Sequence, residues 1–152
     1  MPELSAPLLV HLARRMQTEA EVELVAFGLR ARHVIALTLL RDLGEQSQSD
    51  LPAMLGIDAT NVVALLNELE ADGLIERRRS AEDRRRHTVT LTAAGTRKLA
   101  DIEKVLSVVE HRVLAALSDA EQHHLYTLLA RATASSCSEL LPTAQSCIEG
   151  SE

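Results

Sequence analysis

The sequence predicts a mainly α-helical fold with one small β-hairpin, and three observations support this. Only two of its 152 residues are aromatic, Phe27 and Tyr126, so the core must be built from Leu, Val, Ile and Ala, which suits helix-on-helix packing. Apolar residues recur with a helical period along most of the chain. The period changes to two only beside the arginine-rich stretch 77–86, as it does in a pair of strands.

Two helices are predicted at the beginning of the chain. The first begins near Pro7, because proline is tolerated in a first helical turn, and it ends before Gly28. The second covers residues 31–43, where apolar side chains stand at three-residue steps, and Gly44 follows it.

Two short helices are predicted next, in close succession. The first runs from Ser47 to Leu55, and Gly56 allows a sharp turn after it. The second is capped by Asp58, whose side chain can accept a hydrogen bond from a free backbone N–H, and it ends at Gly73. Two helices joined by a tight turn that contains glycine are typical of a helix-turn-helix.

A hairpin and two further helices complete the prediction. Strands are expected at 74–76 and 88–91, on either side of the arginine-rich loop. Thr92 then caps a long helix from about Ala93 to Leu117, and the run 118–121 is a capping box that begins the last helix. The order of helix-turn-helix, strand, basic loop and strand is that of a winged helix-turn-helix.

The charge distribution indicates the kind of partner. Six of the ten residues from Arg77 to Arg86 are arginine, although the chain has a formal net charge of −6 at pH 7. The rest of the sequence holds 10 Lys and Arg against 20 Asp and Glu. A local basic stripe on an acidic protein is expected of a DNA-binding protein with one contact surface. The scarcity of aromatic residues argues against single-stranded nucleic acid, which is bound by aromatic stacking.

The second helix of such a motif lies in the major groove and presents its first residues to base edges. There Asn61 suits adenine, Thr60 suits a base or a phosphate, and alanine methyls suit thymine methyls. The start of the preceding helix is placed to bind phosphate through side chains and free N–H groups.

The wing supplies the remaining expected contacts. Its arginines can neutralise phosphates or enter an A·T-rich minor groove. Asp83 is expected to pair with Arg85 and hold its guanidinium in one pose. Arg77 begins a strand, so it is equally expected to brace the hairpin. The expected DNA contacts are Ser47, Gln48, Ala59, Thr60, Asn61, Ala64, Arg77, Arg84, Arg85 and Arg86.

Several runs of residues in this region stand at a spacing that is specific when taken together. They are Gln48 with Leu51, Leu55 to Asp58, Leu69-Glu70, Gly73 to Arg77, Asp83 to Arg85, and Val89 to Gly95. With them the stretch 48–95 resembles the multiple-antibiotic-resistance regulator (MarR) family of bacterial repressors, and His33 to Leu37 is similar to the start of that family's second helix. The family usually has alanine where this chain has Pro52, so the helix either begins near Ser49 or bends.

The resemblance implies a triangular homodimer, whose first, fifth and sixth helices form a dimerisation lobe. Leftover apolar surface on the terminal helices also favours a twofold dimer. We therefore expect dimerisation segments at 1–30 and 93–135, a DNA-binding region at 31–92 and a flexible tail at 136–152. The resemblance also implies that Arg85 contacts the minor groove with Asp83 as its support.

The resemblance further implies that a small, often phenolic, anion releases the DNA from a pocket between the two lobes. The expected pocket residues are Phe27, His33, Leu37 and His111. Relatives that respond to cysteine oxidation or to zinc leave two alternatives open. Against them, Cys137 and Cys147 have no basic neighbour, and no His or Cys pair stands at a close ligand spacing. We expect no metal and no cofactor.

Other classes of protein are less consistent with the sequence. It has neither a Gly-rich phosphate loop nor a nucleophile elbow, so we expect no enzyme, and a protein-interaction module stays as the alternative. No apolar run approaches the about 18 residues that span a bilayer, and no secretory signal is recognisable. We expect a cytoplasmic regulator, a repressor, that binds double-stranded DNA at a pseudo-palindromic operator with half-sites roughly 34–36 Å apart.

Overall fold

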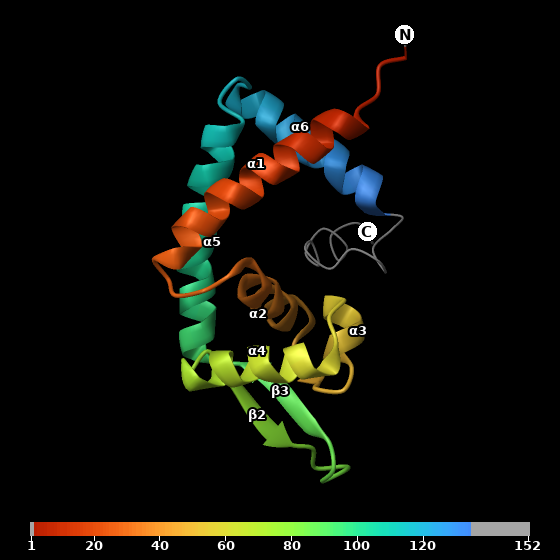
Figure 1. Ribbon diagram of the computed structural model, residues 1–152, viewed down its shortest axis with the longest axis vertical. Helices are drawn as coiled ribbons and strands as arrows, with labels where there is room; N and C mark the ends of the chain where they lie inside the picture. Colours follow the sequence, from red (N-terminus) through yellow and green to blue (C-terminus); the bar gives the residue numbers. More distant parts are fainter. Residues whose placement is uncertain (1, 135–152) are drawn as a thin grey trace.

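Six helices and three short strands make up the part of the chain that the computed structural model describes, residues 2–134. In chain order they are α1 (Ala6–Val25), α2 (Ala31–Leu43), β1 (Gln46–Ser47), α3 (Leu51–Leu55), α4 (Ala59–Ala71), β2 (Ile75–Arg79), β3 (His87–Leu91), α5 (Ala93–Val113) and α6 (Asp119–Thr133). Helix α5 runs along one side of the molecule and joins its two ends (Figure 1). Helices α1 and α6 lie at one end, and α2, α3, α4 and the sheet lie at the other.

The sheet has one strand more than the predicted hairpin. It is antiparallel, with the order β1-β3-β2, and β1 pairs Gln46 with Val89 and Ser47 with Thr88. Strand β2 is also longer than predicted, because its pairing continues as far as Arg79 opposite His87. Half of the arginine block therefore lies in a strand, and the loop is confined to residues 80–86.

The helix predicted from Ser47 was wrong at its beginning. Ser47 belongs to β1, and α3 begins only at Leu51. Pro52 then stands in the first helical turn, where no helical hydrogen bond needs its missing N–H. Gly56 follows with a φ of +66°, a left-handed conformation that glycine adopts without strain, and this turns the chain into α4.

The predicted helix starts were confirmed by their capping hydrogen bonds. The Asp58 carboxylate accepts the backbone N–H of Asn61 at 2.8 Å, and the Thr92 hydroxyl accepts that of Gly95 at 3.0 Å. Ser118 and Glu121 form the predicted capping box. Helix α2 has the predicted bounds, whereas α5 ends at Val113, four residues before the predicted end.

The main core holds the helix-turn-helix against α5. Buried side chains of α2, α4 and β3 pack with those of the first half of α5, among them Leu37, Leu66, Val89 and Leu99, all essentially without exposure. Burying one such aliphatic side chain stabilises the fold by about 1.5–3 kcal/mol. Because α4 contributes four core residues, its position relative to the sheet is fixed by packing.

The other end of the molecule is much less buried. Leu24 is the only buried residue of α1, and α6 has none. Nine of the twelve exposed large hydrophobic side chains among the described residues lie in residues 4–25 or in α6. No helix within residues 2–134 has the length and apolar character needed to cross a membrane.

Candidate nucleic-acid interface

The first half of α4 presents an exposed face. Ala59, Thr60, Asn61 and Ala64 are all exposed, while the opposite face of the helix is buried in the core. The structure thus places these four predicted residues together on one accessible surface, at the end of the helix that Asp58 caps.

Asn61 has a local partner that the sequence pattern did not reveal. Its side-chain amide donates to the Asp58 carboxylate at 2.8 Å, in addition to the capping bond from its backbone N–H. Asp58 therefore fixes the orientation of the Asn61 side chain. The side-chain carbonyl oxygen of Asn61 has no hydrogen-bond partner within residues 2–134 and stays available to a ligand.

A cleft lies between β1, the start of α4 and the base of the wing. Its volume is about 450 Å³, and it brings together predicted residues from three separate segments. Val62, Val63 and Pro52 form its apolar part. Its other lining residues are Ser47, Gln48, Ser49, Ala59, Arg85, Arg86 and His87. Sequence reasoning missed Ser49 and His87, although His87 immediately follows the arginine block and could have been considered on that ground.

The polar groups of β1 and of the turn that follows it are partly occupied. The backbone N–H of Gln48 donates to the carbonyl oxygen of His87 at 2.9 Å, and the hydroxyls of Ser47 and Ser49 lie 2.9 Å apart. The expectation of a free N–H at Gln48 was therefore wrong, because this N–H is bonded to His87 of β3. Its side chain and the two hydroxyls remain as groups that can bind phosphate.

Two of the six arginines are engaged within the protein. Arg77 donates to Glu70 at 2.9 Å and to Asn67 at 2.6 Å, so it braces β2 against α4. The hydrogen bond from Arg77 lowers the pKa of Glu70 below its ordinary value. Arg78 makes two hydrogen bonds of 3.0 Å with Glu76 on the protein surface. Of the two expectations for Arg77, the structure supports the brace.

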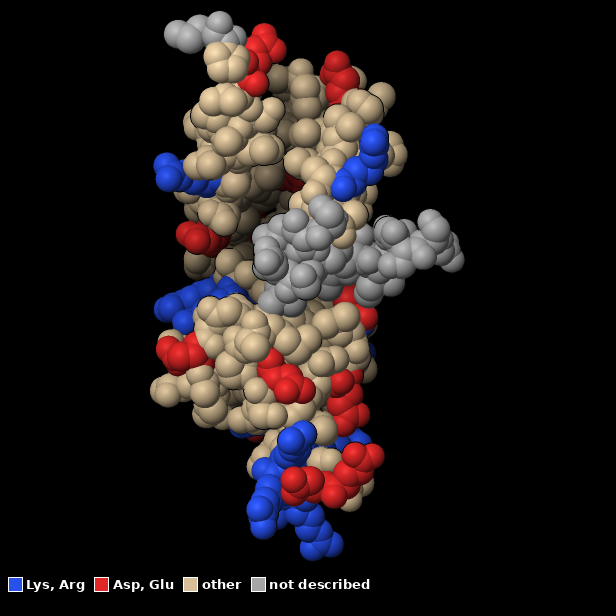
Figure 2. All heavy atoms as spheres, turned by 90° about the vertical axis from the view of Figure 1, so that its right-hand side faces the viewer, with Lys and Arg blue, Asp and Glu red and all other residues tan. Residues whose placement is uncertain are grey.

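The other four arginines form no ion pair within residues 2–134. They are Arg79, Arg84, Arg85 and Arg86, and all are exposed. Figure 2 shows a group of basic side chains at the lower end of the molecule, with acidic side chains beside them. The wing therefore offers unpaired positive charge at the end next to the exposed face of α4.

The predicted pairing between the side chains of Asp83 and Arg85 was wrong. The Asp83 carboxylate instead accepts the backbone N–H of Arg85 at 3.0 Å. The backbone carbonyl oxygen of Asp83 accepts the N–H of Arg86 at 3.0 Å, and the backbone N–H of Ser80 donates to the carbonyl oxygen of Arg86 at 2.8 Å. Asp83 shapes the loop backbone and leaves the guanidinium of Arg85 free.

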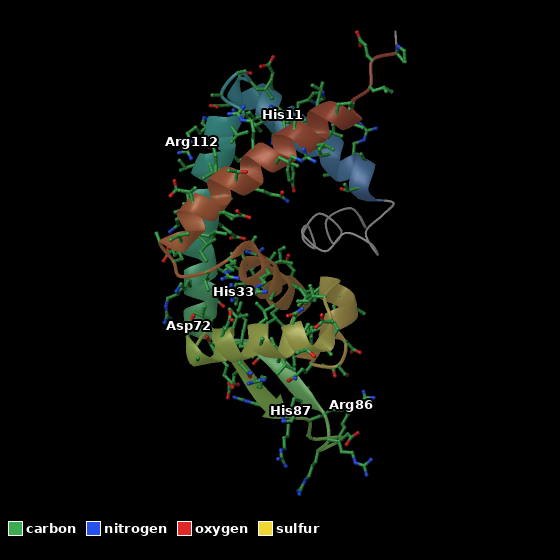
Figure 3. The ribbon with its side chains drawn as sticks, in the orientation of Figure 1. His11, His33, Asp72, Arg86, His87 and Arg112 are labelled. Carbon is green, nitrogen blue, oxygen red and sulfur yellow. The ribbon has the colours of Figure 1, made fainter. Side chains whose placement is uncertain are left out.

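His33 does not line a pocket, contrary to expectation. It is buried, its Nδ1 accepts the backbone N–H of Arg30 at 2.9 Å, and its Nε2 lies 2.5 Å from the Glu68 carboxylate. With Nδ1 as the acceptor, Nε2 carries the proton and donates it to Glu68. This hydrogen bond lowers the pKa of Glu68. His33, which Figure 3 places between the two ends of the molecule, therefore caps α2 and ties it to α4.

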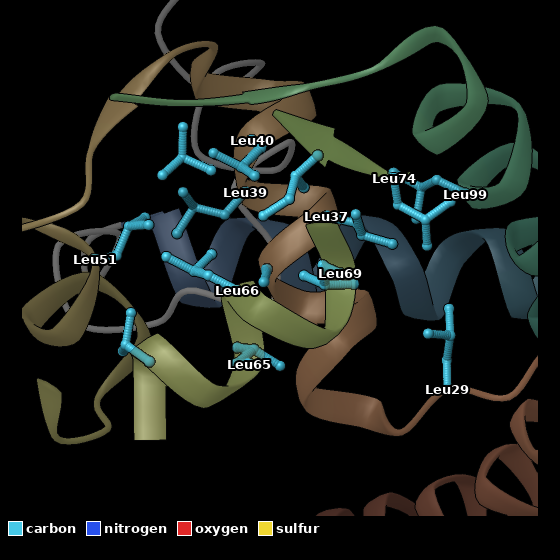
Figure 4. Packing of buried hydrophobic residues seen from close by; sticks show 14 of the residues in the cluster. Leu29, Leu37, Leu39, Leu40, Leu51, Leu65, Leu66, Leu69, Leu74 and Leu99 are labelled. Carbon is cyan, nitrogen blue, oxygen red and sulfur yellow. The ribbon is translucent and has the colours of Figure 1, made fainter. Parts of the chain in front are cut away.

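The other predicted effector residues do not meet in one pocket either. Leu37 is fully buried in the core (Figure 4), and Phe27 packs against the edge of that core. His111 is exposed near the far end of α5, 3.5 Å from Asp119. A cavity of about 230 Å³ lies instead between α1 and α5. Its lining residues are Met16, Gln17, Ala20, Leu106, Val109 and Glu110.

No group of three or more His, Cys, Asp or Glu side chains in residues 2–134 is placed to hold a metal ion. Cys137, Cys147 and the tail predicted at 136–152 lie outside the described residues.

Comparison with protein families gives one match that covers the helix-turn-helix and much of the wing. A family model described as "MarR family" matches residues 27–86. These residues run from just after α1 to the end of the wing loop, and they include the cleft except for His87.

Two curated relatives match a similar part of the chain. A Thauera aromatica protein named for transcriptional regulation of the hcr operon is 40% identical over 85 residues, which are 56% of this chain and 51% of that protein. The HTH-type transcriptional regulator YdgJ of Bacillus subtilis is 36% identical over 104 residues, 68% of this chain and 63% of that protein. The matches therefore span about half to three-fifths of the length of these relatives.

Solved structures share the fold over most of the chain. Apo wild-type MarR from E. coli aligns with a TM-score of 0.77 and 18% identity, over 87% of this chain and 98% of that one. A MarR-family transcriptional regulator from Rhodococcus sp. RHA1 aligns with a TM-score of 0.69 and 26% identity, over 85% and 94%. An E. coli MarR mutant complexed with operator DNA aligns with a TM-score of 0.66 and 19% identity, over 84% and 92%.

Proposed function

The chain belongs to the MarR family, and from that premise we propose that it is a transcription regulator that binds double-stranded DNA in the cytoplasm. The observation that carries the proposal is the arrangement of the cleft, which joins the exposed start of α4 to unpaired arginines of the wing. A surface of this kind binds DNA and needs no catalytic group. The proposal includes repression, which follows when a bound regulator blocks access to a promoter.

In the proposed complex, α4 enters the major groove and its first turns face the base edges. Thr60 and the carbonyl oxygen of Asn61 are the groups that bond to bases, and the methyls of Ala59 and Ala64 contact thymine methyls. The orientation of Asn61 is set in advance by Asp58, so little side-chain freedom is lost on binding.

The wing supplies affinity in this proposal. Arg84, Arg85 and Arg86 contact the sugar-phosphate backbone or the minor groove beside it, where positive charge is favoured. The loop hydrogen bonds of Asp83 keep these arginines on one short, ordered turn.

The test is the salt dependence of DNA binding by the variant Arg84→Ala with Arg85→Ala. Each phosphate contact adds about 0.9 to the magnitude of the slope of log affinity against log salt concentration, so removing two contacts from each subunit lowers that magnitude by about 1.8 for each subunit bound. Fluorescence anisotropy with a labelled duplex measures the slope. The matched control is Arg78→Ala, since Arg78 is exposed but already bonded to Glu76.

The control variant should keep a slope close to that of the wild type. An unchanged slope in the double variant would exclude the wing as a DNA contact. If the wild type binds duplex DNA without any salt dependence, the protein-interaction module becomes the better description.

We also propose a homodimer that binds a pseudo-palindromic operator. Support comes from the apolar side chains of residues 4–25 and of α6, which are exposed in the single chain. A twofold axis would bury both sets and give one recognition helix to each half-site.

For an effector, the cavity between α1 and α5 is the site that we propose. Its lining is mostly apolar, and its only charged residue is Glu110, so it favours a neutral or cationic apolar ligand over an anion. An apolar quaternary ammonium compound should then weaken DNA binding more than an aromatic carboxylate of similar size. Glu110→Gln should remove this preference, and a stronger effect of the carboxylate in the wild type would contradict the assignment.

A further inference from the structure

His87 lies in the cleft of the candidate interface, yet the DNA contacts proposed above give it no role. It is the first residue of β3, and its side chain is exposed. Figure 3 places it at the base of the wing beside Arg86. Its backbone carbonyl accepts the N–H of Gln48 at 2.9 Å, and it pairs with Arg79 of β2, so its backbone is held from both sides.

The register of the sheet tells which way the side chain of His87 points. Side chains alternate along a strand, so His87 lies on the same face as Val89, two residues further on. Val89 is fully buried in the core that α4 helps to form. The imidazole therefore lies on the α4 side of the sheet, which agrees with the presence of Val62 and Val63 in the lining of the same cleft.

The charged groups around His87 come from three elements. The wing loop contributes Arg85 and Arg86, which line the cleft with it. Strand β2 contributes Arg79, directly opposite His87, and Arg77, which Glu70 already engages.

Helix α4 contributes Glu70, whose pKa is lowered mainly by Arg77 and to a smaller degree by His87. Strand β1 and the turn after it offer only the uncharged Ser47, Gln48 and Ser49 to the cleft. The polar part of the cleft therefore includes hydroxyls, guanidinium groups and one imidazole, which suit a phosphate group.

We propose that His87 binds a backbone phosphate of the DNA as the imidazolium ion, so that DNA binding takes up a proton at this residue. The inference rests on the proposed function, because it needs DNA in the cleft. Histidine is the side chain whose charge changes most readily between pH 5 and 8, and both of its ring nitrogens are donors when it is protonated. A phosphate favours that charged form, since an opposite charge stabilises it.

The proposal predicts the sign of the pH dependence. DNA binds the protonated form more tightly, so affinity falls as the pH rises and the proton is lost. Uptake of one proton by each subunit changes the affinity by at most about tenfold per pH unit for each subunit bound. The additional cation also steepens the salt slope by up to about 0.9 per subunit at low pH.

The experiment measures the affinity for a fluorescein-labelled duplex of mixed sequence, about 30 base pairs long so that it can accept two half-sites. Backbone contacts do not depend on sequence, so this probe reports them at low salt. Wild type, His87→Gln, His87→Arg and His111→Gln are compared at about pH 6 and about pH 8. His111 is the control because it is exposed on α5 next to Arg112, which Figure 3 places at the opposite end of the molecule from His87.

We expect the wild type and His111→Gln to bind at least about threefold more tightly at the lower pH, within the limit set by uptake of one proton per subunit. His87→Gln should lose this difference and bind at both pH values as weakly as the wild type does at the higher one. His87→Arg carries a permanent charge, so it should bind at both pH values as tightly as the wild type does at the lower one.

Two results would overturn the inference while leaving the proposed function intact. One is tight, salt-dependent DNA binding by a wild type whose affinity does not change with pH. The other is a pH response that persists in His87→Gln. If the wild type fails to bind the duplex at either pH in low salt, the proposed function itself is wrong and the inference falls with it.

Discussion

The wing loop is shaped by one carboxylate that acts on the main chain. Asp83 accepts the backbone N–H of Arg85, and no ion pair joins their side chains within the described residues. A two-residue separation suits either arrangement, which is why the sequence alone led to the wrong one. The distinction matters because a backbone bond requires an acceptor oxygen, whereas an ion pair requires a negative charge.

Two substitutions of Asp83 separate these roles. Asp83→Asn keeps an acceptor oxygen for the N–H of Arg85 and removes the negative charge, so DNA affinity should be retained or increase. Asp83→Ala removes the acceptor and loosens the loop, so affinity should fall by about threefold to tenfold, the equivalent of losing one hydrogen bond of about 1 kcal/mol. Binding measured at one salt concentration is sufficient. Equal losses in both variants would indicate that the charge of Asp83 is what matters.

The pair formed by Arg77 and Glu70 predicts a pH-dependent stability. Arg77 holds the pKa of Glu70 below its ordinary value of 4.5. The pair therefore stabilises the fold fully above about pH 4.5, and this contribution is lost as the pH falls through the lowered pKa. Arg77→Ala should reduce the free energy of unfolding by about 0.5–1 kcal/mol at neutral pH. Below about pH 4.5 the free energies of unfolding of the variant and the wild type should become more similar.

Urea unfolding at neutral pH and at about pH 3.5 measures this effect. Arg86→Ala is the control, because Arg86 has no ion-pair partner within residues 2–134 and its removal should have no such pH dependence. If the loss of stability in Arg77→Ala stays constant with pH, the bond of Arg77 to Asn67, and not that to Glu70, stabilises the contact between β2 and α4.

At the level of helices and strands, the sequence was most informative where a local rule determines the structure. The caps at Asp58, Thr92 and Ser118 involve residues three positions apart, so one sequence is enough to recognise them. Strand β1 could not be recognised in this way. It has two residues, and it exists because Gln46 and Ser47 meet β3, some forty residues further along the chain.

The same distinction applies to the candidate site. Sequence reasoning identified half of the ten residues that line the cleft, because the order of elements shows where the wing and the second helix meet. It misassigned His33 because the partner of this residue, Glu68, lies on another helix. It also placed Leu37 in a pocket, although the helical period alone cannot tell which apolar residue faces a cavity and which faces the core.

The joint between the sheet and α5 depends on Gly95. A Cβ at this position would overlap the carbonyl oxygen of Leu74 and lie 2.8 Å from a side-chain carbon of Leu91. Gly95→Ala should therefore destabilise the protein by about 1–3 kcal/mol, even though alanine is the better helix former by up to about 1 kcal/mol. Thermal or urea unfolding measures this.

The neighbouring Ala94 provides the control, because it is exposed in the same helical turn. Ala94→Gly should cost no more than about 1 kcal/mol, the ordinary difference in helix propensity. If Gly95→Ala were as stable as the wild type, α5 would have to move away from Leu74, and the spacing between the wing and α5 would differ from that described above.

The whole molecule has an uneven distribution of apolar surface. The end that carries the cleft is closed around a core of leucines, whereas α6 buries none of its residues and Tyr126, Leu128 and Leu129 remain exposed. Helix α1 adds Leu8, which is 68% exposed. Exposed apolar side chains that cluster at one end of a chain are typical of an interface between subunits.

Dimerisation through this end can be tested by a matched pair of substitutions. Leu128 and Leu43 are exposed to nearly the same degree, 44% and 42%, but Leu128 lies in α6 and Leu43 ends α2 in the DNA-binding region. In a twofold dimer Leu128→Asp places a charge in the interface from each subunit, so sedimentation should show a shift from two chains to one at micromolar concentration. Leu43→Asp should remain dimeric.

The monomeric variant should also bind DNA more weakly, because a single α4 reaches only one half-site. A wild type that sediments as one chain, or a Leu128→Asp variant that stays dimeric with full DNA affinity, would mean that the exposed face of α6 serves another contact.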